Sequence, residues 1–157
     1  MTAALDHISR RILHVLALDG RASYQAIADE IGLSRPAVME RVKRLEEGGF
    51  IRGYHARVDR SKAGLPITAF VAIRYPVSSH AGDEPMVQAL ADNPSVLECH
   101  HVAGDDCYVI KVAAASIESL EDVLREIKQP GHPASTRTTI VLSTLFEKPG
   151  IVPVEAD

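Results

Sequence analysis

The fold of the N-terminal part of the chain is decided by residues 23–50, which read SYQAIADEIGLSRPAVMERVKRLEEGGF. Ser23 is a favourable N-cap residue, because its side chain accepts a hydrogen bond from a free N–H of the first helical turn. The apolar residues after it have the i, i+3, i+4, i+7 spacing of a helix with one buried face: Tyr24, Ile27, Ala28 and Ile31. Gly32 ends this helix, since glycine readily takes the left-handed conformation that follows many helices. The stretch therefore begins with a short amphipathic helix.

A longer helix follows at once. Ser34 is its N-cap residue, and Pro36 falls in its first turn, where the N–H that proline lacks would have no partner. Its buried side is formed by Val38, Val42 and Leu45. The residues that face outward are Pro36, Ala37, Glu40, Lys43 and Arg44, and those on the flanks are Arg35, Met39 and Arg41. A short helix, a glycine turn and a longer helix with a basic outer face are typical of a helix-turn-helix, whose second helix enters the major groove of B-DNA. A plain helical bundle is the alternative that the spacing alone leaves open.

The segments on either side extend the same unit. Before it, apolar residues at near-helical spacing predict a helix of about four turns that closes at Asp19-Gly20: Leu5, Ile8, Ile12 and Leu16. After it, Gly48-Gly49 predict a turn, and the alternation over residues 51–58 predicts a short strand. With Arg52, Arg57 and the nearby Arg60, this strand resembles the wing that gives some helix-turn-helix units further phosphate contacts.

The charge of the chain is unevenly distributed. Its 157 residues include 17 basic and 21 acidic ones, a net charge of −4, which by itself argues against a nucleic-acid partner. Residues 1–60, however, hold 10 basic and 8 acidic residues, a net +2, whereas residues 61–157 hold 7 and 13, a net −6. Residues 35–60 alone have a net charge of +3. The asymmetry indicates two modules with different partners.

Composition argues against several other classes of protein. Two cysteines are too few for a disulfide scaffold, and no apolar run approaches the length of a membrane span or has the layout of a secretion signal. We therefore expect a cytoplasmic protein with reduced thiols. The sequence also lacks a phosphate-binding glycine loop, a GxSxG nucleophile motif and an HExxH metal motif, so we expect no enzyme and no cofactor.

The second half alternates strands and helices after a junction at Leu65-Pro66. Its apolar and β-branched runs predict four strands, at residues 68–75, 96–103, 107–113 and 136–145. Helical spacing predicts two helices, near residues 86–91 and 120–127, the second behind a possible cap at Ser116. The resulting order β-α-β-β-α-β is that of a ferredoxin-like domain.

Together these patterns predict an α+β chain with a winged helix-turn-helix domain at 1–60, a linker at 61–67 and a ferredoxin-like domain at 68–157. Both helices of a ferredoxin-like domain lie on one face of its sheet, which leaves the other face bare. We expect the bare face to carry apolar residues such as Phe70, Val102 and Ile110 or their alternates. A bare apolar face usually meets a partner, so we expect a homodimer whose sheets pack face to face.

The N-terminal motifs resemble the DNA-binding half of the Lrp/AsnC, or feast/famine, family of transcription regulators. The resemblance is carried by residues 19–21 (DGR), 31–34 (IGLS), 41–51 (RVKRLEEGGFI) and 53–56 (GYHA). In that family the third helix is the recognition helix for double-stranded DNA. By position this implies a set of residues nearest to DNA: Ser34, Arg35, Ala37, Glu40, Arg41, Lys43 and Arg44.

The second half resembles the regulatory domain of the same family, which senses a small effector, commonly an amino acid, at the contact between dimers. Dimers in the family assemble further, with an octamer among the forms to expect. The family's Gly-Asp-x-Asp turn and Thr-x-Thr pattern imply these effector-binding positions: Gly104, Asp105, Asp106, Cys107, Thr136 and Thr138. Cys107 departs from the pattern, because relatives usually have an aspartate that accepts hydrogen bonds from an ammonium group, and a thiol accepts them weakly. Glycine and aspartate are also ordinary hairpin-turn residues.

Two other interpretations remain open on the residues alone. Cys99, His100, His101 and Cys107 are potential zinc ligands and would suit a metal-responsive regulator, although Cys99 and His101 share one face of a strand and His100 lies on the other. The N-terminal unit could also be a winged-helix module that binds RNA or docks on a protein without sensing an effector. Operator half-sites spaced by one helical turn, about 10 base pairs, would favour the dimeric DNA regulator.

Overall fold

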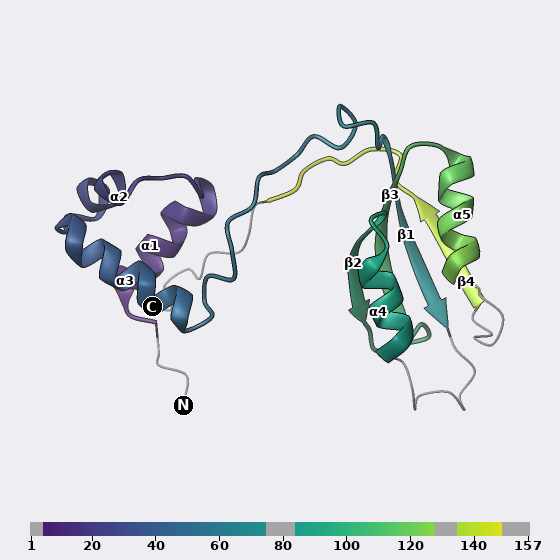
Figure 1. Cartoon of the computed structure of the whole chain (residues 1–157), viewed down its shortest axis with the longest axis horizontal. Coiled ribbons are helices and arrows are strands. Elements are labelled where there is room, and N and C mark those ends of the chain that lie inside the picture. Colours follow the sequence, from purple (N-terminus) through teal and green to yellow (C-terminus); the bar gives the residue numbers. More distant parts are fainter. Residues whose placement is uncertain (1–4, 75–83, 128–134, 149–157) are drawn as a thin grey trace. The chain divides into compact units, whose positions relative to one another are not determined.

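The computed structural model describes residues 5–74, 84–127 and 135–148, and these form two compact units. One unit consists of the described residues up to Arg57 together with those from Leu145 onward, and the other is Val58–Thr144. The elements follow one another as α1-α2-α3-β1-α4-β2-β3-α5-β4 (Figure 1). The α+β class, the three N-terminal helices and the β-α-β-β-α-β order of the second half are therefore confirmed.

Three capped helices make up the first unit: α1 (His7–Leu18), α2 (Tyr24–Ile31) and α3 (Arg35–Glu47). The side chain of Ser23 accepts a hydrogen bond from the N–H of Ala26 at 3.1 Å, and Ser34 accepts one from the N–H of Ala37 at 3.4 Å. Between these helices Gly32 has a φ of 77°, a conformation that residues with a side chain seldom adopt. The caps and the glycine thus fix where α2 ends and α3 begins, as the sequence predicts.

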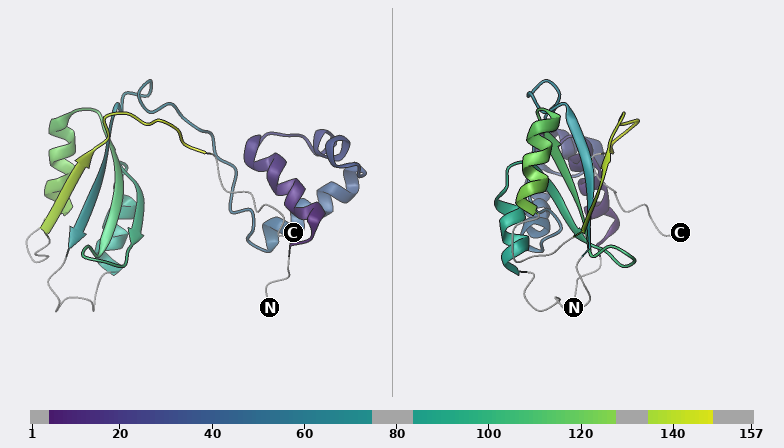
Figure 2. Two further views of the ribbon diagram at one scale, coloured as in Figure 1. Left: turned by 180° about the vertical axis from the view of Figure 1, so that it is seen from behind. Right: turned by 90° about the vertical axis from the view of Figure 1, so that its right-hand side faces the viewer.

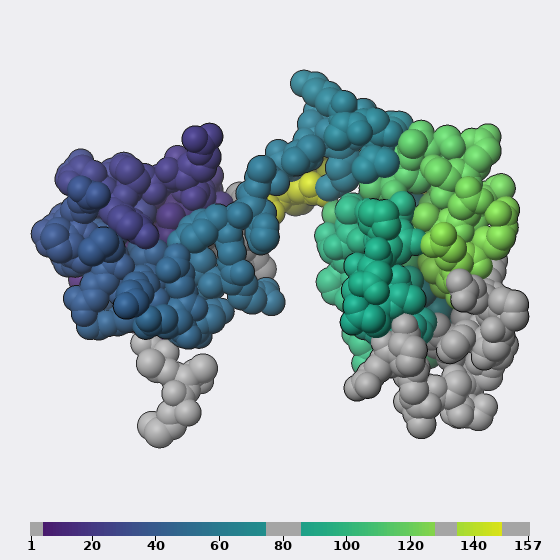
Figure 3. All heavy atoms as spheres, viewed as in Figure 1, coloured from purple at the N-terminus to yellow at the C-terminus, as the bar shows by residue number. Residues whose placement is uncertain are grey.

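The buried faces of the three helices meet in one core. In the space-filling view the purple and blue atoms of this unit form one compact body (Figure 3). Its buried residues come from all three helices: Ile12, Ile27, Ala28, Val38, Val42 and Leu45. Because Val38, Val42 and Leu45 occupy one side of α3, the residues on its other side remain exposed to solvent.

The expected wing strand over residues 51–58 does not form: residues 51–59 contain neither helix nor strand. Figure 1 shows the chain after α3 as an irregular connection. A strand requires a neighbouring strand to pair its backbone groups. Side chains hold this segment instead: Ile51 packs against the core of the unit, and the Tyr54 hydroxyl donates to Glu46 at 2.9 Å.

The second unit contains a four-stranded sheet and two helices. Its strands are β1 (Ile67–Arg74), β2 (Val96–His101), β3 (Tyr108–Ala114) and β4 (Ser135–Ile140), and its helices are α4 (Glu84–Asp92) and α5 (Ile117–Ile127). The strands lie in the order β2-β3-β1-β4, and every neighbouring pair is antiparallel. This is the ferredoxin-like arrangement that the sequence predicts.

Both helices cover the same face of the sheet, as the right-hand view of Figure 2 shows. The core lies between this face and the helices, with Val71 of β1 and Ile110 of β3 directly opposite each other and both fully buried. The expectation that Ile110 lies on the bare face is therefore wrong. Val109 and Ala113 make the other side of β3 largely apolar as well, but Lys111 lies on that side, and its charge is the sequence signal that assigns Ile110 to the covered face.

No helix that the structure describes covers the opposite face of the sheet (Figure 2). Phe70 lies near its centre with an exposed fraction of 41%, as predicted, and Lys111 lies opposite it on β3. Next to Lys111, Glu98 of β2 accepts a hydrogen bond from the Lys111 ammonium at 3.3 Å and bonds the His100 ring at 3.2 Å. We call the residues of this side the open sheet face: Thr68, Phe70, Ala72, Glu98, His100, Val109, Lys111, Ala113, Arg137 and Thr139.

None of the helices that the structure describes has the length and the apolar content needed to cross a membrane.

Candidate DNA-binding surface and effector site

The solvent-exposed side of α3 carries most of the predicted DNA contacts. Arg35, Met39 and Lys43 follow one another at i, i+4 and i+8 along one edge of this side, and all three are exposed. Glu40 and Arg44 lie beside them, while Ala37 is partly buried and Ser34 caps the helix. Arg35 forms no ion pair with any other residue in the described part of the chain. The structure therefore presents a basic helix face of the kind that fits a major groove.

Two of the cations on this face are already paired with glutamates of the same helix. Arg44 forms an ion pair with Glu40, and Lys43 lies 3.7 Å from Glu47. All four side chains are at least 64% exposed. Such intrahelical pairs contribute about 0.3–0.5 kcal/mol each. They are weak enough for the cations to exchange a glutamate for a phosphate at little cost.

Arg41, the remaining residue of the predicted set, turns back toward α1. Its guanidinium donates to the carboxylate of Asp6 at 2.6 Å and lies 3.4 Å from the Ser9 hydroxyl. The Arg41 side chain is 29% exposed. Hydrogen bonds from Arg41 and Ser9 lower the pKa of Asp6 to about 2. Arg41 thus holds α3 against the start of α1, a contact between residues 35 positions apart that the sequence pattern does not reveal.

The Asp6–Arg41 pair predicts a pH-dependent contribution to stability. Because the pKa of Asp6 is lower in the folded chain than in the unfolded one, the contribution is present above pH 4 and disappears as the pH falls toward 2. Asp6→Asn keeps a capping side chain but removes the charge. We expect the wild type to be about 1 kcal/mol more stable than this variant at pH 6, since an exposed pair is screened by water, and equally stable at pH 2. Thermal unfolding at both values measures this, and a pH-independent difference would contradict it.

The turn between β2 and β3 carries the predicted effector-binding residues. Gly104 has a φ of 137°, which favours glycine, and it lies exposed at the tip of the turn. The N–H of Cys107 donates to the carbonyl of Ile73 at 2.8 Å, and the N–H of Val102 donates to the carbonyl of Cys107 at 3.0 Å. The first bond anchors the turn to the end of β1, and the second closes the turn itself.

Two arginines that the sequence reasoning missed hold the aspartates of this turn. Arg74 donates to the backbone carbonyl of Asp105, and its guanidinium lies 3.8 Å from the Asp105 carboxylate. Arg137 donates to the Asp106 carboxylate at 2.9 Å. Arg137 stands between the two threonines of the Thr-x-Thr pattern, so the alternation of faces along β4 is the signal that could have pointed to it.

The predicted effector residues divide between the two faces of the sheet. Thr136 and Thr138 lie opposite Ile73 and Val71 on the helix-covered face, whereas Asp106 reaches Arg137 of the open sheet face. Cys107 packs partly buried against the core. Within one subunit, the structure brings Gly104, Asp105 and Asp106 together at the turn and leaves the threonines on the other face.

The proposed metal ligands do not converge. His100 bonds Glu98 on the open sheet face, whereas the His101 ring lies 5.1 Å from the Tyr108 ring on the other face. Burial raises the pKa of the Cys99 thiol, which disfavours the thiolate that a metal needs. Among the residues that the structure describes, no three Cys, His, Asp or Glu side chains form a group that could hold a metal ion.

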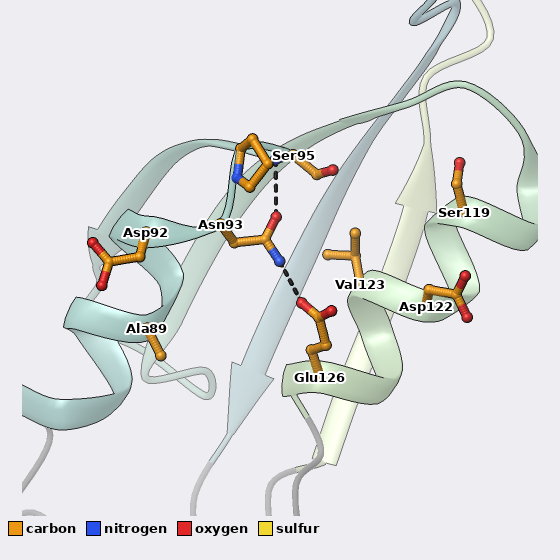
Figure 4. Close-up of a pocket in the computed structure, with 9 residues that line it drawn as sticks. Ala89, Asp92, Asn93, Ser95, Ser119, Asp122, Val123 and Glu126 are labelled. Carbon is orange, nitrogen blue, oxygen red and sulfur yellow. Dashed lines mark hydrogen bonds between the residues drawn. The ribbon is translucent and has the colours of Figure 1, made fainter.

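A depression of about 460 Å³ lies between α4 and α5 (Figure 4). Asn93 bridges it, because its amide donates to Glu126 at 2.5 Å and its oxygen accepts from the N–H of Ser95 at 2.9 Å. Its other polar lining residues include Asp92, Ser119 and Asp122. None of the predicted effector residues lines this depression. It is therefore separate from the turn at Gly104.

Comparisons with known proteins agree with this geometry. Residues 5–46 match the AsnC-type helix-turn-helix domain, and residues 68–151 match the Lrp/AsnC ligand binding domain. The chain is 40% identical over 146 residues to the transcriptional regulator LrpA of Mycobacterium tuberculosis, a match that covers 93% of this chain and 95% of that protein. It is 34% identical over 146 residues to LrpC of Bacillus subtilis, with 93% and 97% covered.

A solved structure shows the same fold over nearly the whole chain. It is that of a feast or famine regulatory protein from M. tuberculosis complexed with L-methionine, which is 39% identical and superimposes with a TM-score of 0.86 over 96% of this chain and 100% of that one. The expected resemblance, the fold and the expectation of a regulator rather than an enzyme are confirmed. The chain belongs to the Lrp/AsnC family of helix-turn-helix transcriptional regulators.

Proposed function

We propose that α3 of this regulator binds the major groove of double-stranded DNA and that an amino acid bound near Gly104 controls the assembly that presents it. The exposed basic face of α3, set in place by the Ser34 cap and by the Arg41–Asp6 contact, carries the proposal. The N-terminal end of such a helix faces base edges, so Arg35 is the base-reading residue. Lys43 and Arg44, farther along, contact phosphates, and Ser34, Ala37 and Glu40 line the same groove.

Lys43→Ala and Arg44→Ala test the phosphate contacts. Each is expected to weaken binding to all duplexes alike and to reduce the slope of log K against log salt by about 1 for each phosphate that the protein no longer neutralises. Fluorescence anisotropy over a range of salt concentrations measures both quantities. Arg125→Ala is a matched control, because Arg125 is an exposed arginine of α5 paired with Asp122 of the same helix at 2.8 Å. Unchanged slopes for the α3 variants would contradict the placement of α3.

The turn at Gly104 is the proposed effector site. Its backbone is held in place by Ile73, its two carboxylates are paired with Arg74 and Arg137, and a similar regulator has been solved with L-methionine. Carboxylates and guanidinium groups of this kind can also bind the ammonium and carboxylate groups of an amino acid. In the family's manner, the ligand would lie between dimers, where Thr136 and Thr138 of another subunit complete the site.

Cys107 is expected to make this site a weak receptor for an ammonium group. Cys107→Asp restores a charged acceptor, and a hydrogen bond to a charged group contributes about 1.5–3 kcal/mol, or more than tenfold in affinity. A thermal-shift screen of the twenty amino acids identifies the ligand, because a compound that binds only the folded protein raises its unfolding temperature. Titration of that ligand then compares the variant with the wild type.

Cys99→Asp is the control for this substitution, because it introduces the same carboxylate at the other cysteine, on β2 away from the turn. It is expected to leave ligand affinity unchanged. Equal ligand affinity in Cys107→Asp and wild type would show that position 107 does not contact the ammonium group. Indifference to all twenty amino acids would overturn the sensing part of the proposal while leaving DNA binding intact.

Assembly is the third part of the proposal. The open sheet face, with Phe70 exposed at its centre, is the surface through which two copies pair. Pairing places two copies of α3 on one DNA molecule, and dimers associate further, up to an octamer. The effector acts by favouring one assembly state over another, which changes the spacing of the recognition helices.

A further inference from the structure

Met39 is an apolar residue on the exposed, charged side of α3. Met39 has an exposed fraction of 51%, although the core of the unit is already filled on this helix by Val38, Val42 and Leu45. It lies one turn after Arg35 and one turn before Lys43 on the same edge of the helix. An apolar side chain is thus held in water between two cations.

The surroundings of Met39 indicate what covers it. A partner that touches all three side chains at once must offer negative charge on either side of an apolar spot. The major groove of B-DNA has this pattern, because guanine presents acceptor atoms to Arg35, the phosphates at the groove edge attract Lys43, and the 5-methyl group of thymine is the apolar group of the base edges. Methionine suits such a contact, since its unbranched thioether chain adapts to an uneven surface.

We infer that Met39 reads the 5-methyl group of a thymine in each operator half-site. The inference rests on the proposed placement of α3 in the major groove. Met39 is the fifth residue of α3 and so belongs to its N-terminal half, which faces base edges. Four residues of helix advance about 6 Å, so the thymine lies within about two base pairs of the base that Arg35 contacts.

Deoxyuridine provides the test, because it lacks only the 5-methyl group of thymine and keeps the same base pair. Duplexes that the wild-type protein binds specifically are first selected from a random pool, and each thymine is then replaced in turn. Removal of one buried methyl group is expected to weaken wild-type binding about fourfold in one half-site and about fifteenfold when both half-sites are substituted. Other thymines are expected to show no effect of this size.

Variants of Met39 connect the effect to this residue. Met39→Ala is expected to bind thymine and deoxyuridine duplexes equally, whereas Met39→Leu, which keeps an apolar side chain, retains a preference for thymine. Leu18→Ala removes a side chain of α1 that is 67% exposed and serves as the control, with the wild-type preference intact. Because the Met39 and Leu18 side chains are both exposed, thermal unfolding is expected to be unchanged in each variant.

The outcomes separate this inference from the proposal on which it rests. If no duplex is selected, DNA binding by α3 fails and the inference fails with it. If a duplex is selected but no thymine responds to demethylation, or the response persists in Met39→Ala, DNA binding stands and the inference is overturned. A methyl-sensitive thymine that becomes insensitive in Met39→Ala, within two base pairs of the position that Arg35→Ala relaxes, supports it.

Discussion

Replacing Arg35 with alanine is expected to weaken specific DNA binding more than any other single change on α3. Arg35 is the first residue of the helix, is exposed, and has no ion-pair partner among the described residues that a base would have to displace. A bidentate contact to guanine contributes about 1–3 kcal/mol in each half-site, which amounts to at least about thirtyfold over two half-sites. Binding to unrelated DNA should fall much less, since only one charge per subunit is removed.

Arg35→Lys distinguishes base reading from simple attraction. Lysine keeps the charge but lacks the planar pair of donors, so this variant is expected to retain the wild-type salt dependence and to lose sequence preference at one base pair. Binding measured on the selected operator and on duplexes changed at each position gives both quantities. If Arg35→Lys discriminated among bases as well as the wild type, the residue would be a phosphate contact instead.

Replacing Phe70 with aspartate is expected to convert the proposed homodimer into monomers. The Phe70 side chain stands on the open sheet face, beside Lys111 of β3 and Thr139 of β4, while the core lies on the other side of β1. In a face-to-face dimer the new carboxylate would be buried, a cost of several kcal/mol that the dimer contact cannot recover. Light scattering measures the change in mass, and operator affinity should fall with it, because one subunit alone holds DNA weakly.

Val87→Asp is the matched control for the Phe70 substitution. Val87 is an apolar residue of α4 with an exposed fraction of 37%, on the opposite side of the same domain. This variant is expected to keep the mass of the wild type. Circular dichroism verifies that both variants retain the sheet. A folded Phe70→Asp protein with the mass of the wild type would show that subunits pair through another surface.

The helix-turn-helix could be predicted because its determinants are local. Ser23, Ser34 and Gly32 specify helix boundaries through bonds within their own turns, and the apolar spacing of α2 and α3 specifies their buried faces. The contact of Arg41 with Asp6 could not be predicted, since it depends on how α1 packs across α3. A helical wheel alone places Arg41 on the flank of α3 and does not reveal which residue it contacts.

In the ferredoxin-like domain, the order of strands and helices was predictable, but the face of the sheet on which each residue lies was less so. Both sides of β3 carry apolar residues, and the one polar residue that separates them is Lys111, which lies on the open sheet face while Ile110 pairs with Val71 on the covered face. The prediction of a wing strand was wrong for a different reason. The alternating pattern over residues 51–58 describes a segment that is able to form a strand, but it does not supply the neighbouring strand with which such a segment must pair. Arg74 and Arg137 escaped notice because their partners are 31 residues away.

The open sheet face has a consequence for which subunits combine. Beside the apolar Phe70 it carries the Lys111–Glu98 pair, so it presents both signs of charge in a fixed arrangement. In the proposed dimer, a second copy of this chain would meet that arrangement with its own, related by symmetry. A related regulator with other charges at these positions would bring like charges together or leave a charge unpaired. In a cell that makes several regulators of this family, the face would keep each protein with its own kind and so keep their gene sets separate.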